Sequence, residues 1–192
     1  MSAQVSEMPE SSTPARALAL PTRFVPPPAR GRTLRYELNV LAVDVADVVS
    51  GIGGWLFDRA LAGWRVEVVA GADGAGVQAL RILGLAVVEP DNWSCSADEV
   101  VALAVMDSRL GSGQPGLGAQ SSGMVFFGPE LDNRLAERVR RVHYRPSAAA
   151  RVFKAQALAV LGQPLGSAEA SERMFRYGPT SDLLDADLTP VC

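Results

Sequence analysis

The chain has 192 residues, of which 48% are hydrophobic and 20% are charged, and its formal net charge is -3. This composition is typical of one folded domain with a sizeable core, and it excludes a chain that is disordered throughout. Two cysteines and a single histidine argue against a disulfide framework and against a zinc site. The sequence has neither a secretory pattern nor an apolar run of about 18 residues, so we expect a cytoplasmic protein that does not contact membranes.

Residues 1–33 are rich in Ser, Pro, Ala and Arg. Few apolar side chains are available there to offset the entropy lost on ordering, so this segment is predicted to be a disordered leader. The folded domain is expected to cover residues 34–165. Residues 166–192 lack a clear periodicity and are expected to form a C-terminal tail that is mostly irregular.

The first strand is predicted at residues 34–43, where apolar and polar side chains alternate before the run becomes entirely apolar. Asp44 and Asp47 follow it and suit the first turn of a helix, which is expected to extend to about Leu61. Gly63 is placed to end that helix in the left-handed conformation. A second strand is then predicted at residues 65–69.

The same order of helix, glycine and strand occurs again directly afterwards. A short helix is predicted at residues 77–83, followed by Gly84 and a third strand at residues 85–88. Two successive units of this kind favour parallel strands joined by right-handed crossovers. The sequence therefore predicts a three-layer α/β domain with a short, mainly parallel sheet of four to five strands and flanking helices.

The next predicted element is a third helix at residues 97–110, capped by Ser96 with Glu99 three positions later. A glycine-rich loop is expected at residues 111–123, and a fourth strand at residues 124–127. The turn at Gly128 leads into the most basic part of the chain.

Between Arg134 and Lys154 seven basic residues stand against one acid, Glu137, a balance of +6. In residues 34–133, five arginines stand against thirteen acids, a balance of -8. The basic stretch is interpreted as two helices that meet at Pro146. On the first helix, spacings of four, three and four place one row of side chains along the edge of the apolar face: Arg134, Arg138, Arg141 and Arg145.

This arginine row is the predicted site for a partner or an anion, and three interpretations of it stay open. The row is a solvated surface, or it docks on the chain's own acidic part, or it binds nucleic acid, a phosphorylated ligand or an acidic partner. The second helix, predicted at residues 148–161, carries no comparable row.

A second candidate site lies where the predicted strands end. Open α/β sheets bind ligands at the carboxyl ends of their strands, where the sequence places Asp44, Asp47, Gly71 and Gly128. Two carboxylates at such a place can act as acid and base or hold Mg²⁺. Their spacing of three also suits helix capping, which is the favoured interpretation.

No catalytic residue, metal or cofactor is predicted. The glycines at positions 51, 53 and 54 come too late after the first strand for a dinucleotide-binding turn. Gly-Lys-Ser/Thr is missing, so a phosphate-binding loop of the usual kind is excluded. The only histidine, His143, lies among arginines, and no serine or cysteine stands in a nucleophile-elbow motif.

The runs at residues 54–64 (GWLFDRALAGW) and 147–155 (SAAARVFKA) resemble those of uncharacterised actinobacterial α/β proteins. The resemblance covers about residues 36–162 and implies a Rossmann-like fold without its glycine fingerprint. It implies no activity and no functional residues.

Three functions are carried forward. The favoured hypothesis is a non-catalytic binding or regulatory protein, not an enzyme, that engages an acidic protein partner or nucleic acid through the Arg-rich helix. The alternative is an enzyme or sensor that binds a small phosphorylated or nucleotide ligand at the strand ends. The second alternative is a structural subunit that forms a homo-oligomer through an apolar helix face.

Overall fold

A computed structural model describes residues 36–93, 100–106, 121–128, 139–163, 170–177 and 187–190. The predicted leader, residues 1–33, lies outside these ranges, as do Arg134 and Arg138. The domain boundaries expected from the sequence therefore stay a prediction. None of the described helices is both long and apolar enough to span a membrane.

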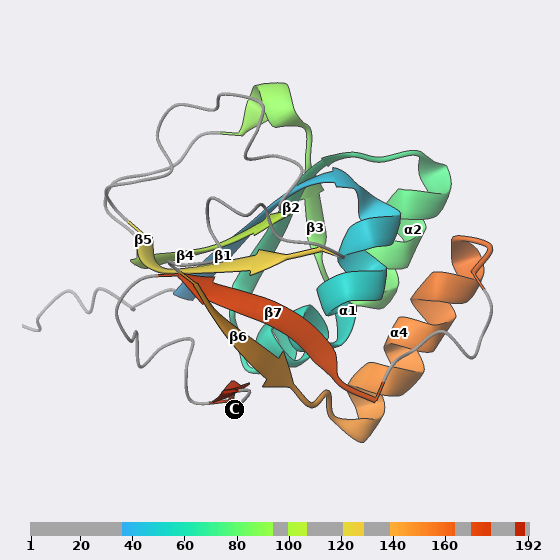
Figure 1. Ribbon diagram of the computed structural model, residues 1–192. Coiled ribbons are helices and arrows are strands. Elements are labelled where there is room, and N and C mark those ends of the chain that lie inside the picture. The colour runs from blue at the N-terminus through green and yellow to red at the C-terminus, as the bar shows by residue number, and fades with distance from the viewer. Residues whose placement is uncertain are drawn as a thin grey trace, which may run out of the picture. The chain divides into compact units, whose positions relative to one another are not determined.

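The described elements alternate between strands and helices in the first half of the chain. The strands are β1 (Tyr36–Asp44), β2 (Arg65–Gly71), β3 (Ala86–Val88), β4 (Val100–Met106), β5 (Ser121–Phe127), β6 (Val139–Tyr144), β7 (Glu172–Tyr177) and β8 (Thr189–Pro190). The helices are α1 (Val45–Leu61), α2 (Gly74–Ile82) and α4 (Ala148–Val160), with a 3-10 turn at Pro90–Asn92. Helices α1, α2 and α4 lie together on one face of the sheet (Figure 1).

All eight strands belong to one mixed sheet with the order β3-β2-β1-β4-β5-β7-β6-β8. The pairs among β1 to β5 are parallel, whereas β7 runs antiparallel to β5 and to β6. The predicted α/β class with flanking helices is confirmed. The predicted sheet of four to five strands is wrong, because β6, β7 and β8 extend the parallel part with antiparallel strands.

The main core lies between the sheet and the helices. Leu38 and Val40 of β1 point into it together with Val48, Ile52 and Trp55 of α1, and all five are fully buried. A smaller cluster on the opposite face of the sheet contains Leu41, Val69, Val105 and Phe126. The apolar run at the end of β1 thus buries Val40 on one face of the sheet and Leu41 on the other, as the sequence predicts. Glu37 and Asn39 lie earlier in the strand, on the face of Leu41.

Two glycines end helices as the sequence predicts. Gly63 after α1 and Gly84 after α2 have φ angles of 90° and 71°, in the left-handed region that a side chain disfavours. Each one returns the chain to the next parallel strand.

The described parts of two predicted helices are strands in the structure. The segment VVALAVM, expected within a helix at residues 97–110, forms strand β4, in which Ala104 and Val105 are buried. A short apolar run cannot be assigned by periodicity, and its β-branched content favours a strand. The segment VRRVHY, expected at the end of the Arg-rich helix, forms β6. Its buried Val142 and Tyr144 alternate with Arg141 and His143, which is the period of a strand.

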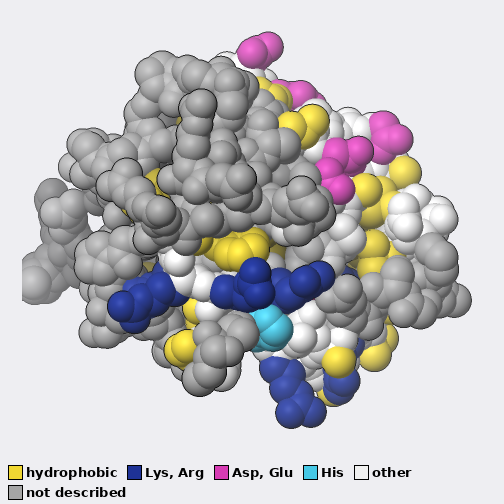
Figure 2. Space-filling model, in the orientation of Figure 1, with side chains coloured by type: hydrophobic (Ala, Val, Ile, Leu, Met, Phe, Trp, Pro, Cys, Tyr) yellow, Lys and Arg dark blue, Asp and Glu magenta, His cyan; other side chains and the backbone are white. Residues whose placement is uncertain are grey.

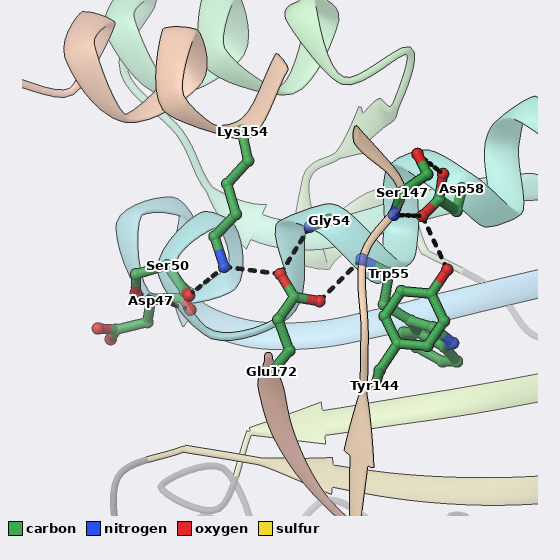
Figure 3. A network of polar contacts seen from close by, with 9 residues as sticks. All are labelled: Asp47, Ser50, Gly54, Trp55, Asp58, Tyr144, Ser147, Lys154 and Glu172. Carbon is green, nitrogen blue, oxygen red and sulfur yellow. Dashed lines mark hydrogen bonds and ion pairs between the residues drawn. The ribbon is translucent and has the colours of Figure 1, made fainter. Parts of the chain in front are cut away.

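A buried ion pair joins α4, β7 and the middle of α1 (Figure 3). Lys154, the only lysine of the chain, and Glu172 are each 1% exposed, and Lys154 Nζ lies 2.6 Å from Glu172 Oε1. The N–H groups of Gly54 and Trp55 donate to the two oxygens of Glu172, each at 2.8 Å. Lys154 Nζ also donates to the carbonyl of Ser50 at 2.7 Å.

The position of these contacts in α1 explains why the pair is needed. In a regular α-helix the N–H of Gly54 donates to the carbonyl of Ser50. Here each of these two backbone groups has a charged partner from another element. The ion pair therefore fixes the middle of α1. The first turns of this helix, which start at the carboxyl end of β1, lie directly before the fixed point.

Asp58 provides a second anchor one turn further along α1 (Figure 3). Its carboxylate accepts hydrogen bonds from the hydroxyl of Tyr144 at 2.7 Å and from the N–H and hydroxyl of Ser147 at 2.9 and 2.7 Å. Burial raises the pKa of Tyr144, and the bond to Asp58 adds to this rise. Since the hydroxyl of Ser147 also caps α4 by accepting from the N–H of Ala150, Asp58 fixes the start of that helix.

Replacing Gly54 by Ala is expected to lower the free energy of unfolding by about 1–3 kcal/mol. A Cβ at this position would lie 2.8 Å from the ring of Pro146 and 3.0 Å from Glu172 Oε1. The neighbouring Gly53→Ala is the control, because its Cβ would meet side chains at 3.4 Å or more and alanine favours a helix. In urea unfolding, the free energy of unfolding should therefore be equal to or above that of the wild type for Gly53→Ala and below it for Gly54→Ala. Equal losses of this free energy in the two variants would contradict the close contact at Gly54.

Candidate functional site at the carboxyl end of the parallel strands

The strand order contains a switch point between β1 and β4. From β1 the chain moves outward through β2 to β3, and it then returns to the other side of β1 for β4 and β5. The connections after β1 and after β4 therefore leave in opposite directions. In open α/β sheets this switch point, at the carboxyl ends of the strands, forms the ligand-binding crevice.

Two carboxylates stand at this point of the sheet. Asp44 is the last residue of β1 and the N-cap of α1, and the N–H of Ala46 donates to its Oδ1 at 2.8 Å. Asp47 lies in the first turn of α1, and both acids are exposed to solvent. The capping interpretation of Asp44 is thus confirmed, and it uses only one of the two carboxylate oxygens.

The two carboxylates differ in their environment. Partial burial raises the pKa of Asp47, and the nearby charge of Asp44 raises it further. A like charge and a lower local polarity both disfavour the ionised form of an acid. Asp47 therefore keeps its proton to a higher pH than an isolated aspartate does, which suits a group that delivers a proton.

Of the two predicted glycines, Gly71 lies beside this pair. It ends β2 as the register partner of Asp44, and a Cβ there would meet no atom within 4 Å. Gly128 follows β5, two strands away from β1, with a φ of 140°. The structure thus brings Asp44, Asp47 and Gly71 together, and it places Gly128 further along the same edge.

The sequence interpretation missed a third acid at this edge. Asp73 follows β2 and caps α2, accepting the N–H of Gly76 at 2.7 Å. Its position between a strand and the segment Gly74-Ala75-Gly76 was the available signal, because small residues behind an acid are common at a helix start. The described residues include no group of three or more His, Cys, Asp or Glu that could hold a metal ion.

The described part of the predicted arginine row does not form a helical surface. Arg134 and Arg138 lie outside the described residues, Arg141 is in strand β6 and Arg145 directly follows it. Side chains at positions 141 and 145 cannot line up with the period of a helix in this conformation. The prediction of an Arg-rich helix, on which the favoured function depended, is therefore wrong for the described residues 139–145.

Solved structures with a similar fold include two deacetylases. One is a deacetylase in complex with teicoplanin, from the biosynthesis of that compound, with a TM-score of 0.51 and 10% sequence identity over 81% of this chain and 98% of the other. The second is a triple mutant of a deacetylase from the teicoplanin biosynthetic pathway, with a TM-score of 0.50 and 11% identity over 77% of this chain and 99% of the other. No protein-family model matches the chain, and no curated protein matches it in sequence.

These similarities correct the favoured functional hypothesis. A non-catalytic binding or regulatory protein was expected, but both of these solved structures are deacetylases. The expectation that the chain is not an enzyme is contradicted by the same finding. At 10% and 11% identity the likeness concerns the fold, so the chemistry has to be argued from this chain's own residues.

Proposed function

We propose that this protein is an enzyme that hydrolyses an acylated small molecule at the carboxyl end of β1, with Asp44 and Asp47 as its acid–base pair. The observation that carries the proposal is the pair of carboxylates at the switch point of the sheet, one of them with a raised pKa. Deacetylation is the favoured reaction, because both solved structures described above are deacetylases with this fold.

The proposed reaction needs one group to accept a proton and one to deliver it. Asp44 is assigned as the base: the carboxylate oxygen that does not cap α1 takes a proton from water as the water oxygen attacks the carbonyl carbon. Asp47 is assigned as the acid, because its raised pKa favours the protonated form. It protonates the departing nitrogen as the C–N bond breaks, and the products are acetate and a free amine.

The surroundings of the pair suit a small substrate. The open position of Gly71 beside Asp44 leaves room above the sheet edge. The N-terminal turns of α1 and α2 both point their N–H groups toward this edge, which favours the negative charge that develops on an attacked carbonyl oxygen.

The proposal is tested by measuring acetate release by the purified full chain from a panel of N-acetylated amines and acetyl esters. We expect release from at least one N-acetylated compound, and a rate lower by about 10²–10⁴-fold in Asp44→Asn. The matched control is Asp91→Asn, a change at an exposed aspartate in the 3-10 turn Pro90–Asn92, which should keep the wild-type rate. No acetate release from any compound would overturn deacetylation, and equal rates in Asp44→Asn and wild type would overturn the assigned base.

A further inference from the structure

We propose that the outer face of β6 and β7 is a binding site for the phosphate group of a small molecule, formed by Arg141, His143 and Arg173. This site is separate from the carboxylate pair at the end of β1. It lies in the strands that extend the parallel part of the sheet.

The strand register places these three side chains on one face. His143 is opposite Arg173, and Arg141 is two residues before His143 in the same strand. Directly opposed residues share a face, as do residues two apart. The intervening pairs, Val142 with Met174 and Tyr144 with Glu172, are buried toward the helices. Arg141, His143 and Arg173 therefore point away from the helix layer.

The three groups are close enough to share one phosphate. Cross-strand neighbours on one face have Cβ atoms about 5 Å apart, and residues two apart along a strand are separated by about 7 Å. Figure 2 shows basic side chains side by side across this surface, with the single histidine of the chain against them. Arg141 and Arg173 are exposed, and His143 is half-buried.

The charge of this face is not balanced within β6 and β7. Their only acid is Glu172, which is buried on the helix side and paired with Lys154. Among the described residues, no ion pair involves Arg141, His143 or Arg173. Arg141 and Arg173 are diagonal neighbours across the two strands. Like charges this close repel each other, so an anion bound between the two guanidinium groups would stabilise the native state.

The types of side chain favour phosphate over other anions. Guanidinium groups offer two parallel N–H donors that match phosphate oxygens, and a histidine adds one more donor. Arg141 is held over the ring of Phe175, with its Cζ 5.8 Å from the ring centroid, which limits the entropy that it loses on binding.

A small phosphorylated molecule fits better than a nucleic acid. The chain has a net charge of -3, and residues 34–133 have a balance of -8, which repels a long phosphate backbone. The three groups also occupy only two neighbouring strands. A cluster of this size suits a single phosphate group better than a chain of them.

The only histidine of the chain makes the test direct, because its ring protons give one set of NMR resonances. Inorganic phosphate and pyrophosphate are titrated into the full chain at constant ionic strength, with chloride as the balancing anion. We expect the His143 resonances to shift and to saturate. Arg173→Gln and Arg141→Gln should each weaken binding by about tenfold or more.

The matched control is Arg151→Gln, a change at an exposed arginine on α4, which should leave the affinity unchanged. A shift that never saturates, or equal effects of Arg151→Gln and Arg173→Gln, would overturn the site. If single-stranded oligonucleotides bind more tightly with each added nucleotide, the ligand of this site is a nucleic acid and the proposal of a small molecule is wrong. Asp44→Asn should bind phosphate like the wild type, so this result stands apart from the outcome of the acetate assay.

Discussion

Replacing Glu172 by Gln is expected to lower the free energy of unfolding by about 3–5 kcal/mol, one of the two largest effects predicted for this chain. The change leaves Lys154, which is 1% exposed, buried without a counter-charge. It also removes the charged acceptor that the N–H groups of Gly54 and Trp55 share at mid-helix. Chemical denaturation of the variant and the wild type at pH 7 measures this difference.

The double variant Lys154→Met/Glu172→Gln separates the ion pair from the packing around it. With both charges removed, the glutamine oxygen still accepts from α1, and no charge is left buried alone. We expect the loss in the double variant to be smaller than the sum of the two single losses by about 2 kcal/mol or more. Additive losses would show that the two charges act independently and would contradict the pair described here.

The charge on Glu172 also predicts how Lys154→Met responds to pH. Burial raises the pKa of Glu172, while Lys154 and the two N–H donors oppose that rise. Without Lys154 the folded state binds a proton at Glu172 more strongly than the unfolded state does. The variant should therefore be most stable at acid pH and lose stability as the pH rises through the raised pKa.

The control is Arg65→Gln, which removes an exposed ion pair instead of a buried one. The Arg65 side chain, which pairs with Glu37 and Glu67, is 57% exposed. Its replacement should therefore lower the free energy of unfolding by at most about 1 kcal/mol.

The rate of acetate release is expected to fall as the pH rises through the pKa of Asp47. Partial burial and the charge of Asp44 raise this pKa, and Asp47 must be protonated to act as the acid. The optimum should therefore lie on the acid side of neutrality. In Asp47→Asn the rate is lower and the decline at higher pH disappears, because the group that loses its proton is no longer there.

The variant Asp44→Asn tests whether Asp47 causes the decline of the rate at higher pH. Replacing Asp44 by Asn removes the negative charge that raises the pKa of Asp47, so any residual activity should decline at a lower pH than in the wild type. An unchanged position of the decline in Asp44→Asn would show that another group delivers the proton. The profile of Asp91→Asn should match that of the wild type.

The first half of the fold could be predicted because its signals are local. The apolar run of β1, the acids at the start of α1 and the glycines at 63 and 84 each have a short-range physical reason, and all of them have the predicted conformation. The same local signals located the carboxylate pair, because the carboxyl end of a parallel strand follows from the order of the elements.

The second half was predicted less well because its structure depends on contacts between distant residues. Strand β7 joins the sheet between β5 and β6, and its Glu172 meets a helix more than 100 positions earlier in the chain. The alternation of Val142 and Tyr144 with Arg141 and His143 covers only four residues, which is too short a run to identify a strand. The spacing of Arg138, Arg141 and Arg145 fits a helix as well, so the period of the charges suggested the wrong element.

The burial of the only lysine could not be predicted either. A lysine in a helix is usually exposed, and Lys154 lies in a segment that also carries the exposed Arg151. Its burial follows from the presence of Glu172, which pairs with it from another part of the sheet. The partner is recognised only when the tertiary structure is available.

The most direct test of the proposed function is the rate of acetate release by Asp47→Asn, measured beside the wild type on the compound that the wild type hydrolyses fastest. We predict a loss of about 10²–10⁴-fold at the optimum pH, with the unfolding free energy of the variant close to that of the wild type because the Asp47 side chain is exposed. A wild-type rate in Asp47→Asn would contradict the assignment of the active site to the carboxyl end of β1.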